Sequence, residues 1–130
     1  MKKTNPKILI VDDDEGVCGC LRDICVSAGC DVKISSEASA ALEVLKGEPF
    51  HLVISDVRMP HMDGVSFLDA LEKEQIDVPV VMMTGYTDYS PEKIDELNAV
   101  ALLQKPFSGK QVREIIEHYV QLLPSMIEQD

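Results

Sequence analysis

Acidic side chains directly follow two apolar segments of this chain, and their placement points to chemistry. Asp12, Asp13 and Asp14 come after the run KILIV, and Asp56 comes after the run HLVIS. Carboxylates gathered in one space repel one another and cannot all stay ionised without compensation. A hard divalent cation such as Mg²⁺ compensates them, because it prefers oxygen ligands and needs only one or two carboxylates beside water and phosphate oxygens. The acidic residues therefore indicate a Mg²⁺ site, provided that the two segments lie side by side.

A hydroxyl group and an ammonium group follow two further apolar runs. Thr84 comes after PVVMM, and Lys105 follows shortly after VALL. A carboxylate beside a metal ion can attack phosphorus and form an aspartyl phosphate. Lys105 and Thr84 could then pair with the phosphoryl oxygens.

Each of these residues also has a plainer interpretation. Asp14 precedes a helical pattern and could cap a helix, and an acidic run is often a solvated surface. Lys105 could be a surface lysine, and Thr84 could simply end a strand. The coincidence of all these groups at the ends of predicted strands favours a site.

The remaining sequence predicts the elements that would position these groups. Apolar runs alternate with segments of helical periodicity, which is typical of a parallel sheet with helices on both faces. Strands are expected over Lys7–Val11, Asp31–Ser35, His51–Ser55, Pro79–Met83 and Val100–Leu103. We expect an α/β fold, a flavodoxin-like doubly wound five-stranded parallel sheet in the order 2-1-3-4-5. In that order the first and third strands are neighbours, so Asp12, Asp13 and Asp56 would meet at one edge.

The expected helices are recognised by their apolar faces and end residues. The first helix has an apolar face of Val17, Leu21, Ile24, Cys25 and Ala28 and is ended by Gly29, and the second has Ala38, Ala41, Leu42 and Leu45, with Ser36 as its cap and Gly47 at its end. The third buries Val65, Leu68 and Leu71, and the fourth is a short helix capped by Ser90 with Pro91 at its first position. The last follows a capping box of Ser108 and Gln111 and buries Val112, Ile115, Ile116, Tyr119 and Val120.

Composition narrows the possible functions. The length of 130 residues predicts one domain, with a core over about 7–122 and a C-terminal tail over 123–130. The net charge of −11 argues against direct binding to nucleic acid or to anionic membranes, which need a cationic surface. No apolar run approaches the length of a membrane span, and no signal peptide is visible. The 4 cysteines form no C-x-x-C pair, so buried, reduced thiols in the cytoplasm are expected.

Four motifs together resemble the receiver domains of two-component response regulators. They are ILIVDDD, LVISDVRMPHMDG, VVMMTG and QKPF, and the resemblance runs from about Lys7 to Leu122. It implies that Asp56 is the phosphoacceptor, that Thr84 is the switch hydroxyl and that Lys105 pairs with the phosphate.

The same resemblance implies a metal site and two backbone features. Asp13 would bind Mg²⁺ directly, Asp12 would act as its neighbour, often through water, and the backbone carbonyl of Arg58 would complete the protein ligands with Asp56. The Lys105–Pro106 bond is expected to be cis. Gly64 would give the loop after the phosphoacceptor a permissive backbone.

Partners also follow from the resemblance. A sensor histidine kinase or a histidine phosphotransfer protein would donate the phosphoryl group, so the chain would catalyse only its own phosphorylation and dephosphorylation and would not be an enzyme in the usual sense. A downstream protein would bind the face made by the predicted fourth helix, the fifth strand and the last helix, and a homodimer is a further candidate. His51, His61 and His118 do not cluster in sequence, which favours a donor histidine on another protein.

The sequence departs from the family pattern at three places. Leu102 stands where receivers usually carry Tyr or Phe, so an aliphatic side chain would have to take over the movement of that ring. Asn98-Ala99 replaces the usual Gly-Ala, and the interval to Lys105 is about one residue short. Tyr86 and Arg58 occupy positions that tune hydrolysis, and we expect them to shield the phosphoryl group. An unchanged or slower dephosphorylation of Tyr86→Ala would contradict the expectation for Tyr86.

Other functions compete with a phosphorylation switch. A Mg²⁺-dependent phosphohydrolase of the haloacid dehalogenase type would need a second Asp where Arg58 stands. The chain could be a receiver fragment of a longer transcription factor or hybrid kinase, although no helix-turn-helix is recognised after the last predicted helix. It could also be a pseudo-receiver that binds partners without phosphorylation, which the complete acidic set argues against.

Overall fold

The computed structural model describes residues 5–59, 62–85 and 99–120, and these residues confirm the predicted α/β sheet. All strand pairs are parallel, and the order is β2-β1-β3-β4-β5. The elements are β1 Lys7–Val11, α1 Glu15–Ser27, β2 Asp31–Ser35, α2 Ala38–Gly47, β3 Leu52–Asp56, α3 Gly64–Lys73, β4 Val80–Thr84, β5 Ala101–Gln104 and α5 Gly109–Val120.

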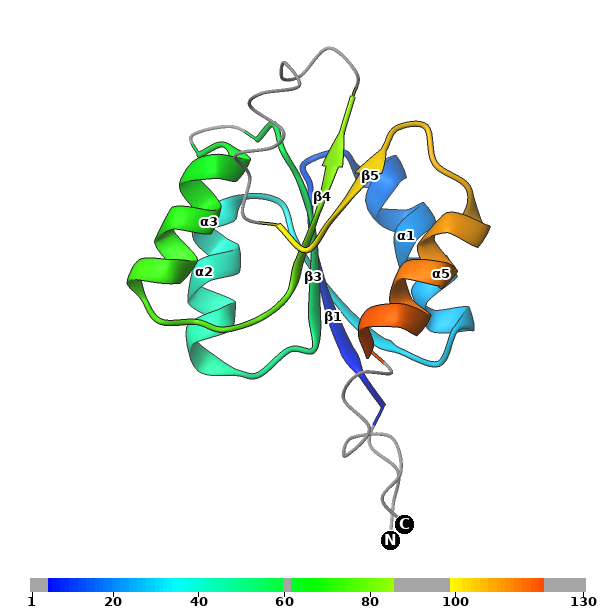
Figure 1. Ribbon diagram of the computed structural model, residues 1–130, viewed down its shortest axis with the longest axis horizontal. Coiled ribbons are helices and arrows are strands. Elements are labelled where there is room, and N and C mark those ends of the chain that lie inside the picture. The colour runs from blue at the N-terminus through cyan, green and yellow to red at the C-terminus, as the bar shows by residue number, and fades with distance from the viewer. Residues whose placement is uncertain (1–4, 60–61, 86–98, 121–130) are drawn as a thin grey trace, which may run out of the picture.

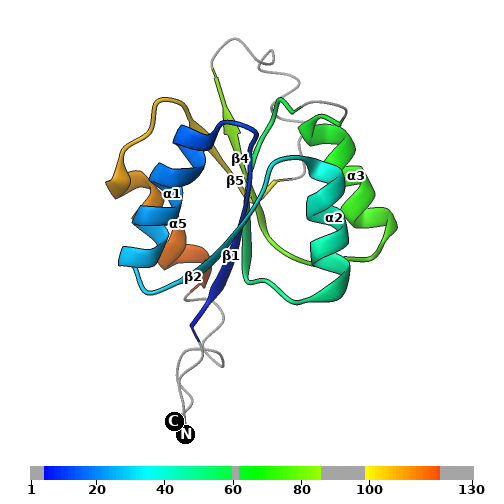
Figure 2. The same cartoon turned by 180° about the vertical axis from the view of Figure 1, so that it is seen from behind.

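Helices cover both faces of the sheet. Helices α1 and α5 lie on one face, and α2 and α3 lie on the other (Figure 1). The view from behind shows the same two layers around β1 and β2 (Figure 2). Every residue of β3 and β4 is buried, which explains why their sequences are apolar almost throughout. Each sheet face has its own apolar cluster, one with Ile8, Ile10 and Leu21 and the other with Leu9, Val53 and Phe67.

The register of the strands brings their carboxyl ends to one edge. Val11 pairs with Ser55, Asp56 with Met83, and Thr84 with Gln104. Residues that follow β1, β3, β4 and β5 must therefore emerge close together.

Two helix ends agree with the predicted signals. At α5, the Ser108 N–H donates to Gln111 Oε1 (2.8 Å) and the Gln111 N–H donates to Ser108 Oγ (3.2 Å), which is a capping box. Helix α1 ends before Gly29, whose φ of 93° suits the left-handed conformation after a helix. The Cys30 N–H donates to the Cys25 carbonyl (3.0 Å) and closes this turn.

Several details of the prediction were wrong. Ser36 does not cap α2, because the N-cap is Glu37 and its side chain makes no capping hydrogen bond. Ala28 is exposed, because α1 ends one residue earlier. In α3, the prediction named Val65 and Leu68, which are only half-buried, and missed Phe67, which is fully buried.

Strand limits and one thiol also differ from expectation. Strands β3 and β4 begin one residue later than predicted, and β5 is shifted by one residue to Ala101–Gln104. All four cysteines are free as expected, but Cys20 is exposed because it lies on the outer side of α1. Several predictions fall outside the described residues: Tyr86, the helix from Ser90, Asn98, His61 and the tail 123–130.

Candidate functional site

Four strand ends deliver the predicted residues to the carboxyl edge of the sheet. Asp56 and Thr84 are the last residues of β3 and β4, and Asp12 follows β1; all of them are buried. The Asp12 N–H donates to the Ser35 carbonyl (3.1 Å), and the Lys105 N–H donates to the Thr84 carbonyl (2.8 Å). The backbone ladder thus extends past the strands and fixes where these side chains begin.

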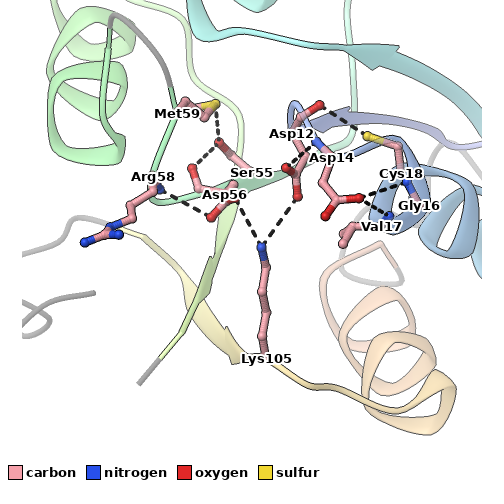
Figure 3. A network of polar contacts seen from close by, with 10 residues as sticks. All are labelled: Asp12, Asp14, Gly16, Val17, Cys18, Ser55, Asp56, Arg58, Met59 and Lys105. Carbon is pink, nitrogen blue, oxygen red and sulfur yellow. Dashed lines mark hydrogen bonds and ion pairs between the residues drawn. The ribbon is translucent and has the colours of Figure 1, made fainter. Parts of the chain in front are cut away.

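Lys105 points between the two buried carboxylates, as Figure 3 shows. Its Nζ lies 3.1 Å from Asp56 Oδ2, where it donates a hydrogen bond, and 3.7 Å from Asp12 Oδ2. Partial burial acts to lower the pKa of Lys105, but the hydrogen bond to Asp56 and the surrounding negative charge raise it above its ordinary value. The ammonium group is therefore charged at neutral pH.

Asp12 is only partly compensated in this arrangement. Its Oδ1 accepts the Asp14 N–H (3.0 Å), whereas its Oδ2 is buried and accepts no hydrogen bond from the part of the chain described. Burial raises the pKa of Asp12 to about 6, the bond from the Asp14 amide opposes this, and the Asp56 charge adds to the rise. A buried carboxylate oxygen without a hydrogen bond is costly and calls for a cation.

Oxygen atoms of Asp12, Asp13 and Asp56 all lie within 4.8 Å of one another. Asp13 is exposed, so an ion at this cluster would retain contact with water. Asp14 takes no part in the cluster, because it caps α1: its Oδ1 accepts the N–H groups of Gly16 (2.9 Å) and Val17 (3.2 Å). An acidic oxygen set with access to water fits the chemistry of Mg²⁺.

The loop after β3 is held against the site by backbone hydrogen bonds. The Arg58 N–H donates to Asp56 Oδ1 (3.3 Å), and the Gly64 N–H donates to the Val57 carbonyl (2.7 Å). Gly64 was expected to provide backbone freedom, but its role here is space. A Cβ atom at this position would lie 3.1 Å from Val57 Cα and 3.2 Å from Met82 Sδ.

Two buried side chains contact the backbone of the acidic residues, and neither was predicted from the sequence. Cys18 Sγ donates to the Asp12 carbonyl (3.3 Å), and burial with nearby acidic charge raises the pKa of this thiol to about 11. Ser55 Oγ donates to the Asp56 carbonyl (3.1 Å). A serine inside the apolar strand run HLVIS was the available signal for the second contact.

The structure brings together Asp12, Asp13, Asp56 and Lys105, and it buries Thr84 at the same edge. The Lys105–Pro106 bond is cis, as expected. Among the helices that the structure describes, none is long and apolar enough to cross a membrane.

The structure thus defines a class of domain: a doubly wound parallel sheet in which an acidic cluster faces a lysine at the carboxyl edge. Residues 8–117 match the family model of the response regulator receiver domain, and the chain belongs to this family. It is a receiver domain of two-component response regulators, as the motifs suggested.

Known relatives agree with this assignment. The chain is 36% identical over 116 residues to the transcriptional regulatory protein FixJ of Bradyrhizobium diazoefficiens, covering 88% of this chain and 56% of that protein, or about half its length. It is 29% identical to sporulation initiation phosphotransferase F of Bacillus subtilis, covering 91% and 96% of the two chains. The structure of the Francisella response regulator 1452 receiver domain superposes with a TM-score of 0.82 at 26% identity, covering 92% of this chain and 99% of that one.

Proposed function

We propose that this receiver accepts a phosphoryl group on Asp56 and that the added charge changes which partner it binds. The observation that carries this proposal is the 3.1 Å contact of Lys105 Nζ with Asp56 Oδ2, inside a cluster of carboxylate oxygens. The buried carboxylate is oriented for attack on phosphorus, and the fixed ammonium group beside it can neutralise negative charge on the product.

In the transfer step, an Asp56 carboxylate oxygen forms a bond to phosphorus while the bond from phosphorus to the donor nitrogen breaks. The electron pair of that bond leaves with the donor imidazole. Lys105 moves its hydrogen bond to a phosphoryl oxygen, and the Arg58 N–H stays near the Asp56 side chain. Thr84, buried at the end of β4, supplies a hydroxyl for another oxygen.

Mg²⁺ is the cofactor that the acidic cluster fits. Asp12, Asp13 and Asp56 would hold it, together with the Arg58 backbone carbonyl. When bound, Mg²⁺ neutralises charge on the phosphoryl oxygens. Asp12 Oδ2 supports this assignment, because it is buried next to the other carboxylates and accepts no hydrogen bond from the described residues, with only the Lys105 ammonium group 3.7 Å away.

The partners follow from this chemistry and from the relatives. A sensor histidine kinase or a histidine phosphotransfer protein would donate the phosphoryl group, and the name of the Bacillus phosphotransferase agrees with a relay role. The chain would turn over no other substrate, would act in the cytoplasm as one domain over residues 1–130, and would not bind nucleic acid directly.

The output face would include β5 and α5, with the segment between β4 and β5. Leu102 is 41% exposed on β5, so an aliphatic side chain is available for contact there. Phosphorylation would shift a pre-existing equilibrium between two arrangements of this face. A downstream protein or a second copy of the chain would read the change.

Intact mass spectrometry tests the proposal. The protein is incubated with Mg²⁺ and acetyl phosphate, and wild type is compared with Asp56→Asn. We expect one phosphate-sized mass gain in wild type only. An equal gain in Asp56→Asn, or no gain in folded wild type, would contradict the proposal.

A further inference from the structure

Ser55 is a buried polar residue next to the proposed phosphoacceptor, and the proposed phosphorylation does not use its hydroxyl group. It is the residue before Asp56, it is fully buried, and side chains alternate along a strand, so the two point to opposite faces of β3. Asp56 faces Lys105, whereas Ser55 faces the side covered by α2 and α3. Buried hydroxyl groups in folded proteins nearly always make a hydrogen bond, so the partner of this hydroxyl indicates its role.

The Ser55 hydroxyl contacts both ends of the segment from Asp56 to Met59. Ser55 Oγ lies 3.1 Å from the Asp56 carbonyl oxygen and 4.0 Å from Met59 Sδ. Figure 3 shows this pair of contacts on Ser55, separate from the contacts that Lys105 makes with the carboxylates. The strand β1 pairs with β3 only as far as Ser55, so the Asp56 carbonyl lies at the end of that ladder. A side-chain donor at this point replaces a strand partner.

Residues 57–59 are held by four contacts. The Val57 N–H donates to the Met83 carbonyl (3.0 Å), and the Val57 carbonyl accepts the Gly64 N–H (2.7 Å). The Arg58 N–H donates to Asp56 Oδ1 (3.3 Å), and Met59 Sδ contacts Ser55 Oγ. The Arg58 carbonyl belongs to this short segment. Its direction depends on the peptides on either side of it.

We propose that Ser55 is a positioning residue of the receiver site. Its hydroxyl fixes the Asp56 peptide and the loop through Met59, and thereby sets the direction of the Asp56 carboxylate and of the Arg58 carbonyl. The metal-binding part of this inference rests on the proposed function. Groups that orient metal ligands from behind typically change metal affinity by about 10–100-fold when they are removed.

Two measurements on the full chain compare wild type, Ser55→Ala and the control Val53→Ala. Val53 is fully buried on the same face of β3, two residues earlier, and its hydrocarbon side chain can donate no hydrogen bond to the site. The first measurement is amide hydrogen exchange without metal, followed by NMR. The second is the Mg²⁺ dissociation constant, measured by calorimetry on the unphosphorylated protein.

In Ser55→Ala we expect the amides of residues 57–59 to lose about tenfold more protection than the amides of β1. We expect its Mg²⁺ dissociation constant to rise about tenfold. Val53→Ala should lower protection evenly and leave the Mg²⁺ constant within about twofold of wild type, because it removes only packing.

The inference is overturned if the loop amides change no more than those of β1, if Mg²⁺ binds Ser55→Ala as tightly as wild type, or if Val53→Ala weakens Mg²⁺ equally. A wild-type protein that binds no Mg²⁺ contradicts the proposed function instead. The exchange comparison alone then decides the role of Ser55.

Discussion

The Lys105 ammonium group donates a hydrogen bond to the Asp56 carboxylate at 3.1 Å, although 49 positions separate the two residues in the chain. Each lies at the carboxyl end of a strand, and β4 lies between those strands in the sheet. The contact is thus a consequence of the parallel order and register. It turns one acidic strand end into a site with a fixed cation.

Removing that cation should slow phosphorylation. We expect Lys105→Met to lower the rate of Asp56 phosphorylation by acetyl phosphate by about 10²-fold, because charge developing on the phosphoryl oxygens loses its fixed partner. The rate is measured from intact mass against time at saturating Mg²⁺. Lys110→Met, on the exposed part of α5, is the matched control and should react like wild type. A Lys105→Met rate equal to that of the control would show that Lys105 has no part in the transfer.

Neutralising Asp12 should stabilise the metal-free protein. Its folded pKa of about 6 is above its ordinary value of 3.8. Between these two pH values the native state therefore binds more protons than the unfolded state. The stabilisation from protonated Asp12 is fully present below pH 3.8 and is lost as the pH rises through about 6. At pH 7 the buried, charged carboxylate destabilises the metal-free native state. Asp12→Asn should therefore raise the free energy of unfolding by about 1–2 kcal/mol.

Urea unfolding in EDTA measures this change, with Asp23→Asn on the exposed side of α1 as the control. Mg²⁺ should reverse the order of stability. A ligand at 100 times its dissociation constant stabilises the native state by about 2.7 kcal/mol, and Asp12→Asn should gain much less of this than wild type. A metal-free Asp12→Asn that is less stable than wild type would contradict our account of the buried oxygen.

A side chain at position 64 should destabilise the fold. A Cβ would meet the Val57 backbone at 3.1 Å, which cannot move as a flexible side chain would. We expect Gly64→Ala to lower the free energy of unfolding by about 1–3 kcal/mol. Gly47 at the end of α2 has nothing within 4 Å of such an atom, so Gly47→Ala should be near neutral. Equal effects of the two substitutions in urea unfolding would refute the packing argument.

His51 should make stability depend on pH. Burial lowers its pKa from the ordinary 6.5, and its Nδ1 accepts the Lys7 N–H (2.9 Å) in the neutral form. Because the folded pKa is depressed, the unfolded state binds more protons below pH 6.5, so this stability is present above 6.5 and is lost as the pH falls through the folded pKa. His51→Asn keeps an acceptor without titrating. Its free energy of unfolding should fall less than that of wild type between neutral and mildly acidic pH, and an equal fall would count against the assignment.

The sequence allowed the fold and the acidic edge to be predicted, because both depend on period and order. Apolar runs marked the strands, and the residues that follow them, Asp12, Asp56, Thr84 and Lys105, necessarily meet once the strand order is chosen. Details that depend on which way one side chain faces were missed. Phe67 on α3 and Ser55 on β3 are buried because of the side of the element on which each lies. Ser36 looked like a cap, although α2 begins two residues later and its N-cap is Glu37.

The most direct test of the central claim identifies the phosphorylated residue. After reaction with Mg²⁺ and acetyl phosphate, borohydride reduces an aspartyl phosphate to homoserine, and peptide mass spectrometry locates that residue. We predict homoserine at position 56 and at no other aspartate. Homoserine at Asp12 or Asp13, or its absence from a protein that has gained phosphate, would contradict the claim.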